Sequence, residues 1–399
     1  MNPMSLLKQF RRWLGESRRH QILAAGVVLV AAGTLAAVAV VVAVSGDGDR
    51  QEKLIVRTVT ASPAAEASSR PNRGTPSPRA IPERSPSPQL ETVAFSRGGD
   101  IWLIKADGTD LANLTNNPAR DSAPSWSPDG SRIAFISERD GNEEIYLMNA
   151  DGSRVTNLTG NPARDGPYFA WSPDGTRIAF TRSVDAPPDN DIFVMSADGS
   201  GQTRLTNDGN FKRPVAWSPD GLHIAFTSVR SELEGGQKTL SYEVYAVNPD
   251  GSGLTILSRQ LYDTEEWGAS FAYSPDGSFI AVQGVRQRTS DIYILNAGGS
   301  ASTNLTNGSP LGKNPTWSPD GDRIAFDSFS GDIYVMRSDG SALTNLTNTV
   351  SIDLLPAWSP EGSKIAFLSY GPEFGANLYV MGADGSGQVR LVEGLVAEE

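Results

Sequence analysis

The chain has 399 residues, a formal net charge of −12 and a sequence isoelectric point of about 4.8. The acidity is uneven, because residues 93–399 carry −17 while residues 1–20 carry +4 and residues 45–92 carry +1. An acidic body repels phosphate backbones, which argues against nucleic acid as a partner. The absence of cysteine excludes disulfides, thiolate chemistry, cysteine-ligated metals and a cysteine-linked lipid anchor.

The N-terminal region predicts one membrane span. Residues 22–44 contain no charge, and Thr34 is their only polar side chain. A run of this length can cross a bilayer as a helix and is longer than the apolar part of a usual signal peptide. Basic residues crowd the preceding stub, residues 1–21, so the positive-inside rule puts the stub in the cytoplasm and the rest of the chain in the periplasm or at the cell surface. A cleaved signal peptide is the alternative, and the length favours an uncleaved signal anchor.

Residues 45–92 predict a disordered linker. Pro, Ser, Ala and Arg dominate this stretch, as in residues 76–79, and apolar periodicity is absent. Such a composition cannot bury enough apolar surface to fold. We expect a partly extended tether that separates a folded domain, residues 93–399, from the membrane.

The rest of the chain repeats an aromatic residue, Ser-Pro-Asp-Gly and a short apolar run. Six copies begin at Trp126, Trp171, Trp217, Tyr273, Trp317 and Trp358. Their spacings are 45, 46, 56, 44 and 41 residues, and the last copy has Glu361 in place of Asp. A period in the forties that is built from short strands and turns is typical of a β-propeller, in which each repeat is one blade.

One repeat, residues 122–159, contains the parts of a complete blade. Ser-Pro-Asp-Gly at 127–130 predicts a type I turn, because Pro presets φ at the second position and Gly relieves crowding at the fourth. A second turn is expected at 150–152. The predicted strands are 124–126, 132–135, 144–148 and 155–159.

The strand motifs give the number of blades. The Ser-Pro-Asp/Glu-Gly turn occurs six times, whereas the second-strand motif occurs seven times, first at residues 93–95. The chain is therefore expected to enter partway through a blade that lacks its first strand. Ring closure commonly borrows such a strand from the other terminus, here the tail at residues 394–396. We predict an all-β propeller of seven four-stranded blades, with six blades as the alternative.

The repeated elements resemble those of the TolB-like β-propeller family. The resemblance rests on Trp-Ser-Pro-Asp-Gly, Ile-Ala-Phe, Asp-Ile-Tyr-Val-Met and Ala-Asp-Gly-Ser, and it covers residues 93–392. It implies a periplasmic or cell-surface interaction scaffold, of the kind that in some members is bound to membrane-protein systems. The chain differs from the family's namesake in its anchor and tether, in the lack of a preceding α/β domain, and in one more blade. Similar propellers gate substrates in prolyl peptidases, but we expect no hydrolase domain here.

Alternate loops of an antiparallel blade lie on alternate faces of the ring. The Ser-Pro-Asp-Gly and Ala-Asp-Gly turns, such as 127–130 and 150–152, share one face and barely vary; we call it the uniform face. The loops that enter each first strand share the other face with those between second and third strands, and we call this the variable face. Its loops differ in length and charge, and the longest insertions lie around 231–241 and 260–268. Recognition is therefore predicted on the variable face.

The candidate binding residues are the charged and aromatic residues of the entry loops. Aromatic residues are favoured as anchors at interfaces. An isolated charge in such a loop is more often simply solvated, so the prediction concerns the face as a whole. The candidates are Arg120, Asp121, Arg164, Asp165, Phe211, Lys212, Arg213, Tyr262, Glu265, Glu266, Trp267, Lys313 and Asp353.

No catalytic constellation emerges from the sequence. The two histidines are His20, beside the span, and His223, which occupies a repeat position filled by arginine in other blades. Zinc ligation and Ser-His-Asp catalysis both need histidines that the chain does not offer. We expect no cofactor. Structural Ca²⁺ on the Asp-Gly turns is a weak alternative, because no loop has the alternating Asp spacing of a dedicated site. The Asn-Leu-Thr sequences, which match glycosylation sequons, recur because the fourth strand recurs.

These observations predict a membrane-anchored, extracytoplasmic propeller that binds a protein, a peptide or an envelope component without catalysis. The membrane contact is made through residues 22–44. One alternative is a hydrolase or lyase with its site at the propeller channel. The other is the extracytoplasmic sensor of a signalling system, which would need a cytoplasmic partner for residues 1–20.

Overall fold

The computed structural model describes residues 92–184, 190–234, 237–262, 270–286, 289–299, 302–371 and 376–394, together with two short strands, β1 (Val38–Ala39) and β2 (Val59–Thr60). These two strands pair with each other. The predicted stub, span and linker otherwise lie outside the described residues, so the span at 22–44 stays a prediction. Within the described ranges, no helix is long and apolar enough to cross a membrane.

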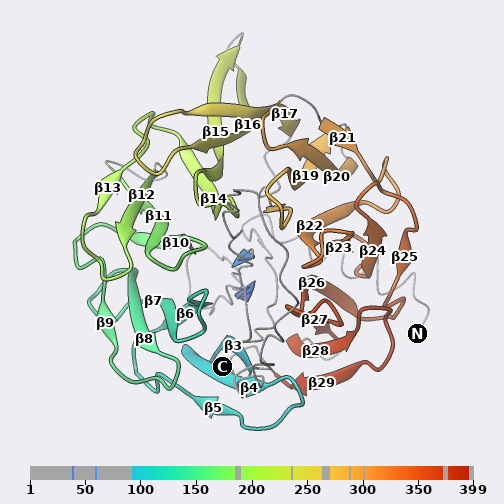
Figure 1. Ribbon diagram of the computed structural model, residues 1–399, viewed down its shortest axis with the longest axis horizontal. Helices are drawn as coiled ribbons and strands as arrows, with labels where there is room; N and C mark the ends of the chain where they lie inside the picture. The colour runs from blue at the N-terminus through green and yellow to red at the C-terminus, as the bar shows by residue number, and fades with distance from the viewer. Residues whose placement is uncertain are drawn as a thin grey trace, which may run out of the picture.

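The described chain forms a ring of seven β-sheet blades around a central axis (Figure 1). The first blade consists of β3 (Thr92–Arg97), β4 (Asp100–Lys105) and β5 (Ala112–Asn113). The second consists of β6 (Asp121–Trp126), β7 (Arg132–Ser137), β8 (Glu144–Asn149) and β9 (Thr156–Asn157). The third consists of β10 (Asp165–Trp171), β11 (Arg177–Ser183), β12 (Asn190–Ser196) and β13 (Thr203–Arg204). The seven-blade prediction is thereby confirmed, and the six-blade alternative is wrong.

The fourth and fifth blades are joined into one eight-stranded sheet by a single parallel pair, Tyr262 with Val285. The fourth blade consists of β14 (Phe211–Trp217), β15 (Ile224–Glu234), β16 (Gln237–Val247) and β17 (Thr255–Tyr262). The fifth consists of β18 (Phe271–Tyr273), β19 (Phe279–Arg286), β20 (Thr289–Asn296) and β21 (Ser302–Asn304). The insertion predicted around 231–241 extends β15 and β16 into a hairpin that projects beyond the ring (Figure 1).

The last two blades return to the regular four-stranded pattern. The sixth blade consists of β22 (Gly312–Trp317), β23 (Arg323–Ser328), β24 (Ile333–Arg337) and β25 (Thr344–Asn345). The seventh consists of β26 (Ile352–Trp358), β27 (Lys364–Tyr370), β28 (Ala376–Gly382) and β29 (Val389–Val392). The tail predicted to close the ring lies outside the described residues, apart from Gly394. The Gly394 N–H donates to Asn377 Oδ1 at 3.0 Å.

The core lies between the blades and is built from the second and third strands. Ile133 and Phe135 of β7 are fully buried, as are their counterparts in the other Ile-Ala-Phe copies. Phe135 packs on Tyr146 of β8 with 5.8 Å between ring centroids. Equivalent aromatic pairs occur in four further blades: Phe180–Phe193, Phe226–Tyr245, Phe326–Tyr334 and Phe367–Tyr379. Each blade therefore buries one face of its sheet against its neighbour.

The repeated tryptophan links the third, fourth, sixth and seventh blades to the blade before each. The Trp171 indole N–H donates to the carbonyl of Ser125 in the preceding blade at 3.2 Å. The Arg132 guanidinium of that preceding blade lies over the Trp171 ring at 5.3 Å. The same indole bond is made by Trp217 to Ala170, Trp317 to Ala272 and Trp358 to Thr316. His223 occupies the position of Arg132, as predicted from the repeat.

Backbone hydrogen bonds agree with the predicted division into two faces. On the uniform face, the Ala150 N–H of the second turn donates to the Ser131 carbonyl beside the first turn at 3.0 Å. On the variable face, the Asp165 N–H at the start of β10 donates to the Glu143 carbonyl of the loop before β8 at 2.8 Å. The two loop classes therefore lie at opposite ends of the blades.

The structure also explains why Asn-Leu-Thr recurs. In the second blade, the Asn157 side-chain oxygen accepts from the N–H groups of Thr159 and Gly160. The Thr159 hydroxyl accepts from the Ile145 N–H of the neighbouring strand. The motif thus ends the fourth strand and turns the chain toward the next blade, and equivalent bonds form at Thr115, Thr306 and Thr347.

Candidate functional site: the variable face

Four of the candidate charges are not solvated loop residues. Asp121, Asp165 and Lys212 are 0% exposed, and Asp353 is 1% exposed. Each lies at or near the start of an inner strand, β6, β10, β14 or β26, just below the variable face. A buried charge needs a partner, so the groups that contact these four side chains below the loops are part of the candidate site.

In the second blade, Asp121 is paired with Arg139 of the loop between β7 and β8. Arg139 Nη2 donates to both carboxylate oxygens of Asp121 at 3.1 and 3.0 Å. The same guanidinium lies 4.7 Å from the ring centroid of Tyr146. The pair therefore ties a variable-face loop to the inner strand of its own blade.

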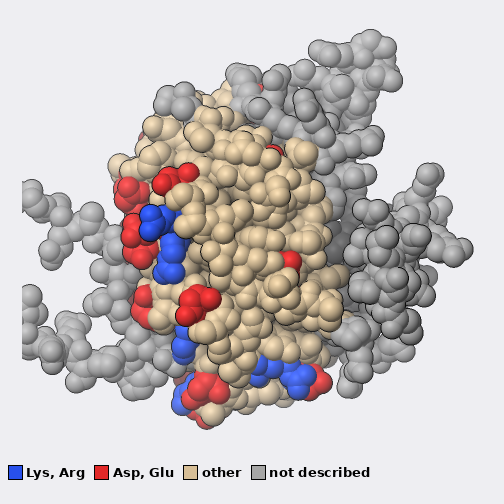
Figure 2. Space-filling model, turned by 90° about the vertical axis from the view of Figure 1, so that its right-hand side faces the viewer, with Lys and Arg blue, Asp and Glu red and all other residues tan. Residues whose placement is uncertain are grey.

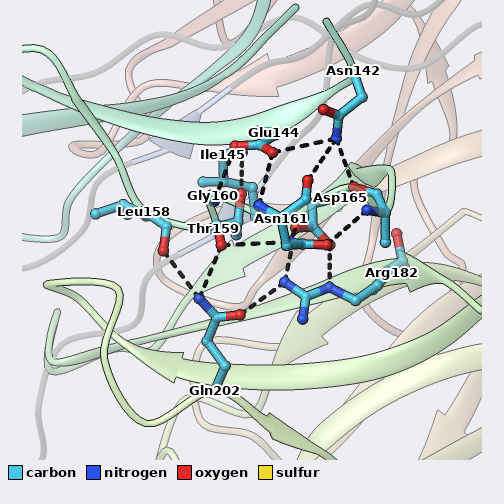
Figure 3. Close-up of polar contacts among 12 residues, drawn as sticks. Asn142, Glu144, Ile145, Leu158, Thr159, Gly160, Asn161, Asp165, Arg182 and Gln202 are labelled. Carbon is cyan, nitrogen blue, oxygen red and sulfur yellow. Dashed lines mark hydrogen bonds and ion pairs between the residues drawn. The ribbon is translucent and has the colours of Figure 1, made fainter. Parts of the chain in front are cut away.

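Asp165 is the centre of a denser network in the third blade (Figure 3). Arg182 Nε and Nη2 donate to its two oxygens at 2.5 and 2.8 Å, and Asn161 Nδ2 donates at 2.5 Å. Burial raises the pKa of Asp165, while the hydrogen bond and charge of Arg182 oppose that rise. Arg182 also donates to Gln202 Oε1 at 2.8 Å, which brings the turn before β13 into the network.

The neighbouring Glu144 holds the loop that leads to Asp165. Its carboxylate accepts from the N–H groups of Gly160 and Asn161, both at 2.9 Å. The Asn142 amide bridges to this loop by donating to the carbonyls of Asn161 and Ala163 at 3.1 and 2.7 Å. Figure 3 shows Asn142 and Glu144 of the second blade and Arg182 of the third blade around this one loop.

Lys212 is buried in the same manner between the third and fourth blades. Its ammonium lies 3.0 Å from Asp191 Oδ1 and also pairs with Asp208. Arg204 forms a second ion pair with Asp191. Lys212 further donates to the Asn210 carbonyl at 2.8 Å. A lysine without exposed surface is therefore surrounded by two carboxylates and backbone oxygen.

On the other side of the ring, Lys313 is paired with a buried carboxylate, whereas Asp353 forms no ion pair with a cation among the described residues. Lys313 Nζ lies 3.3 Å from Asp327 Oδ2 and 5.2 Å from the Phe329 ring centroid. Burial raises the pKa of Asp327, against the Lys313 charge. Burial likewise raises the pKa of Asp353, whose Oδ2 accepts from Thr349 at 3.0 Å. Asp353 Oδ1 has no hydrogen-bond partner in the structure.

The remaining candidates differ in exposure. The Arg164 side chain is 57% exposed and makes a bidentate pair with Glu143, with both nitrogen–oxygen distances 2.6 Å. Arg213 lies 5.3 Å from the Phe211 ring centroid, and both side chains are partly buried, as is that of Arg120. The side chain of Tyr262 and the whole of Glu265, Glu266 and Trp267 lie outside the described residues.

Sequence reasoning missed the partners Arg139, Arg182, Asp191 and Asp327. Two of them carried a usable signal, because Asp165 pairs in register with Arg182 and Lys313 with Asp327 across the first two strands of a blade. Opposite charges at paired positions of a hairpin stabilise it and are readable once the register is known. Within the described ranges, no group of three or more His, Asp or Glu side chains has an arrangement that could hold a metal ion.

Charge is not spread evenly over the side of the ring at β21–β25. Figure 2, which views the ring from the side of β21–β25, shows Lys, Arg, Asp and Glu gathered along one margin and the lower edge, with the signs intermixed. Almost all of the visible described wall between them is formed by other residues. This side therefore offers no broad surface of one sign for a strongly charged ligand.

Comparison with known proteins supports the propeller family through short stretches of sequence. The family model of the Tricorn protease N-terminal β-propeller domain matches residues 83–172. A TolB homologue from Chlorobium luteolum is 39% identical over 61 residues, which is 15% of this chain and 14% of the relative. The Tol-Pal system protein TolB of Nitratidesulfovibrio vulgaris is 50% identical over 36 residues, or 9% of this chain and 8% of that protein. The chain thus spans less than a sixth of the length of each of these relatives.

Solved structures share the fold at low sequence identity. An oligogalacturonate lyase in complex with manganese gives a TM-score of 0.58 at 15% identity, covering 75% of this chain and 83% of the lyase chain. A puromycin-hydrolysing peptidase of Mycobacterium tuberculosis gives 0.58 at 16% identity, covering 77% and 52%. These likenesses show the fold alone. The repeats and the short matches to curated relatives support a resemblance to TolB-like β-propellers.

Proposed function

We propose that the chain is a membrane-anchored, extracytoplasmic scaffold whose variable face binds a protein, a peptide or an envelope component without catalysis. The anchor is the apolar run at residues 22–44, and the tether is the stretch that follows it. The namesake relatives support a role within an assembly, since one of them is a Tol-Pal system protein.

The observation that carries the proposal is the buried support beneath an exposed loop. Asp165 is fixed from below by Arg182 and Asn161, while its neighbour Arg164 stands in solvent beside Glu143. A loop that is already ordered loses less conformational entropy when it binds a partner. The variable face is therefore preorganised to present charged groups at fixed positions.

The same arrangement disfavours acid–base chemistry by these carboxylates. Asp121 and Asp165 are held by guanidinium groups that do not give up a proton near neutral pH. A general acid or base has to exchange its proton with a substrate, and neither side chain has exposed surface through which to do so. Their geometry suits a structural role beneath a binding surface.

The test is a comparative pull-down with the full chain in detergent from an envelope extract. The variant Arg164→Gln/Glu143→Gln removes from the variable face an ion pair whose arginine is exposed and whose glutamate is mostly buried. The matched control, Lys105→Gln/Asp110→Asn, removes the 2.5 Å pair at the turn between β4 and β5 on the uniform face. We expect the first variant to lose a partner about tenfold, or ~1.4 kcal/mol in binding free energy, while the control retains it. Equal recovery by both variants would refute the proposal.

A further inference from the structure

Arg213, on the inner strand of the fourth blade, is the exception among the cations described above. Among the residues that the structure describes, its guanidinium donates no hydrogen bond and forms no ion pair, and it lies over the Phe211 ring at 5.3 Å. Its Nε is buried without a hydrogen-bond partner. The other cations of the site each have a carboxylate beside them: Arg139, Arg164, Arg182, Arg204, Lys212 and Lys313.

A guanidinium in this position calls for an acceptor from outside the chain. Arginine stays protonated in proteins, so Arg213 cannot shed its charge to relieve its burial. A partly buried charge that no group of the protein compensates costs free energy. The two Nη groups are not among the buried atoms that lack a partner, so they have exposed surface. An anion can therefore reach them from the variable face, where β14 begins.

Thr227 supplies a second donor beside Arg213. The two residues are paired across β14 and β15, and directly opposed side chains of an antiparallel pair lie on the same face of the sheet. Thr227 is 0% exposed, and its hydroxyl has no hydrogen-bond partner among the described residues. Lys212 precedes Arg213 and therefore points to the opposite face of the sheet, together with its carboxylate partners.

An apolar pair lies next to these two donors, toward the variable face. Phe211 is paired with Val229, and both side chains are partly buried. Because side chains alternate along a strand, this pair shares its face of the sheet with Arg213 and Thr227. The fourth blade thus has two unpaired donors on the inside and two apolar groups at the rim.

We propose that Arg213 and Thr227 bind a carboxylate of a protein or peptide partner, and that an apolar residue beside this carboxylate packs against Phe211 and Val229. This assignment rests on the proposed function, since it places the partner on the variable face. The forked geometry of a guanidinium matches the two oxygens of a carboxylate. The carboxylate comes from a chain terminus or from an aspartate or glutamate side chain.

Two other classes of anion fit the site less well. A phosphate dianion needs a second cation, and the adjacent Lys212 is already paired with Asp191 and Asp208 on the other face of the sheet. The acidic body of the protein further disfavours a ligand with two negative charges. A sugar acid would place ring hydroxyl groups against the apolar pair, which leaves them without hydrogen bonds.

Short peptides added to the full chain in detergent test the class of ligand. N-acetyl-Gly-Leu-Leu carries the carboxylate at its terminus, and N-acetyl-Leu-Asp-Leu amide carries it on a side chain. The neutral controls are the amide of the first peptide and the Asn form of the second. By ligand-observed NMR titration, we expect at least one acid to bind about tenfold more tightly than its neutral control. Equal binding of both acids and their controls refutes the proposal, as does tighter binding of glucuronate or inorganic phosphate.

Three variants assign the binding to residues. Arg213→Gln is expected to weaken the acidic peptide about tenfold. Thr227→Val should weaken it severalfold without lowering the unfolding midpoint, because the Thr227 hydroxyl makes no bond within the described chain. Arg337→Gln is the matched control, since it removes an exposed arginine where β24 ends at the uniform face. It should bind the peptide as the unmodified chain does.

Peptide binding that survives Arg213→Gln, or that falls equally in Arg337→Gln, overturns the carboxylate site. The pull-down with Arg164→Gln/Glu143→Gln tests the variable face without touching Arg213. Failure of the carboxylate site therefore leaves the proposed function standing. Equal recovery in that pull-down, with peptide binding still lost in Arg213→Gln, refutes the proposed function and supports the site.

Discussion

The two faces of the propeller place their charged side chains in different surroundings. On the uniform face, Asp174 accepts from Ser172 Oγ, Thr176 N and Thr176 Oγ1, all within one turn. On the variable face, Asp165 and Lys212 reach groups on other strands and loops. A turn whose hydrogen bonds all form within it can be repeated unchanged around the ring. A charged residue whose partner lies on another strand or loop makes its blade differ from the others. Recognition is therefore expected where the repeats differ.

The largest effect is expected at Lys212, where loss of the ammonium leaves Asp191 buried beside only one cation. Removal of one partner of a buried pair costs about 3–5 kcal/mol when the remaining charge is left uncompensated. Because Arg204 still pairs with Asp191, we expect Lys212→Met to reduce the free energy of unfolding by up to that amount in denaturant titrations. Asp208→Asn, which removes the more exposed partner, is the control and should cost clearly less. Equal losses in the two variants would contradict this account of the site.

Asp353 beneath the variable face and Asp174 on the uniform face should also respond to pH with opposite signs. Burial raises the pKa of Asp353 above its usual 3.8, so the ionised carboxylate destabilises the fold as the pH rises past that value. Burial alone would also raise the pKa of Asp174, but hydrogen bonds from Ser172 and Thr176 outweigh it and lower the pKa. The stabilisation that these hydrogen bonds give to the ionised Asp174 is present above pH 3.8 and is lost as the pH falls through the lowered pKa.

Two asparagine variants turn this difference into a measurement. We expect Asp353→Asn to stabilise the protein at neutral pH and Asp174→Asn to destabilise it. Both effects should shrink toward zero as the pH is lowered through and below 3.8, the ordinary carboxyl pKa. Unfolding curves at several pH values check the signs. If both variants destabilised the protein at neutral pH, the predicted difference between Asp353 and Asp174 would be wrong.

The smallest effect is expected at Arg164, whose side chain is 57% exposed, although that of its partner Glu143 is only 13% exposed. Exposed ion pairs contribute about 0–1 kcal/mol to stability, and we expect this partly exposed pair to stay within that range. Arg164→Gln should therefore leave the unfolding midpoint nearly unchanged while it weakens partner capture. A large loss of stability would show that the pair supports the loop and is not displayed for binding.

Much of the fold was predictable because the repeat contains a recognisable turn sequence and regularly spaced aromatic residues. Seven second-strand copies gave seven blades, and the antiparallel order of the strands gave the two faces. The burial of Asp121 and Lys212 was not predictable from their loop-like surroundings. Their partners Arg139 and Asp191 lie in other loops and strands, so only the folded register brings them together.

The four tryptophan bonds point the same way around the ring, from the third, fourth, sixth and seventh blades back to the blade before each. Each of these blades therefore donates across one of its two interfaces, as in the head-to-tail contact of a cyclic oligomer. Such contacts close when the circle is complete and continue into fibres when it is not. In a complete ring each blade covers one side of its neighbour, which removes the open ends at which head-to-tail contacts could continue.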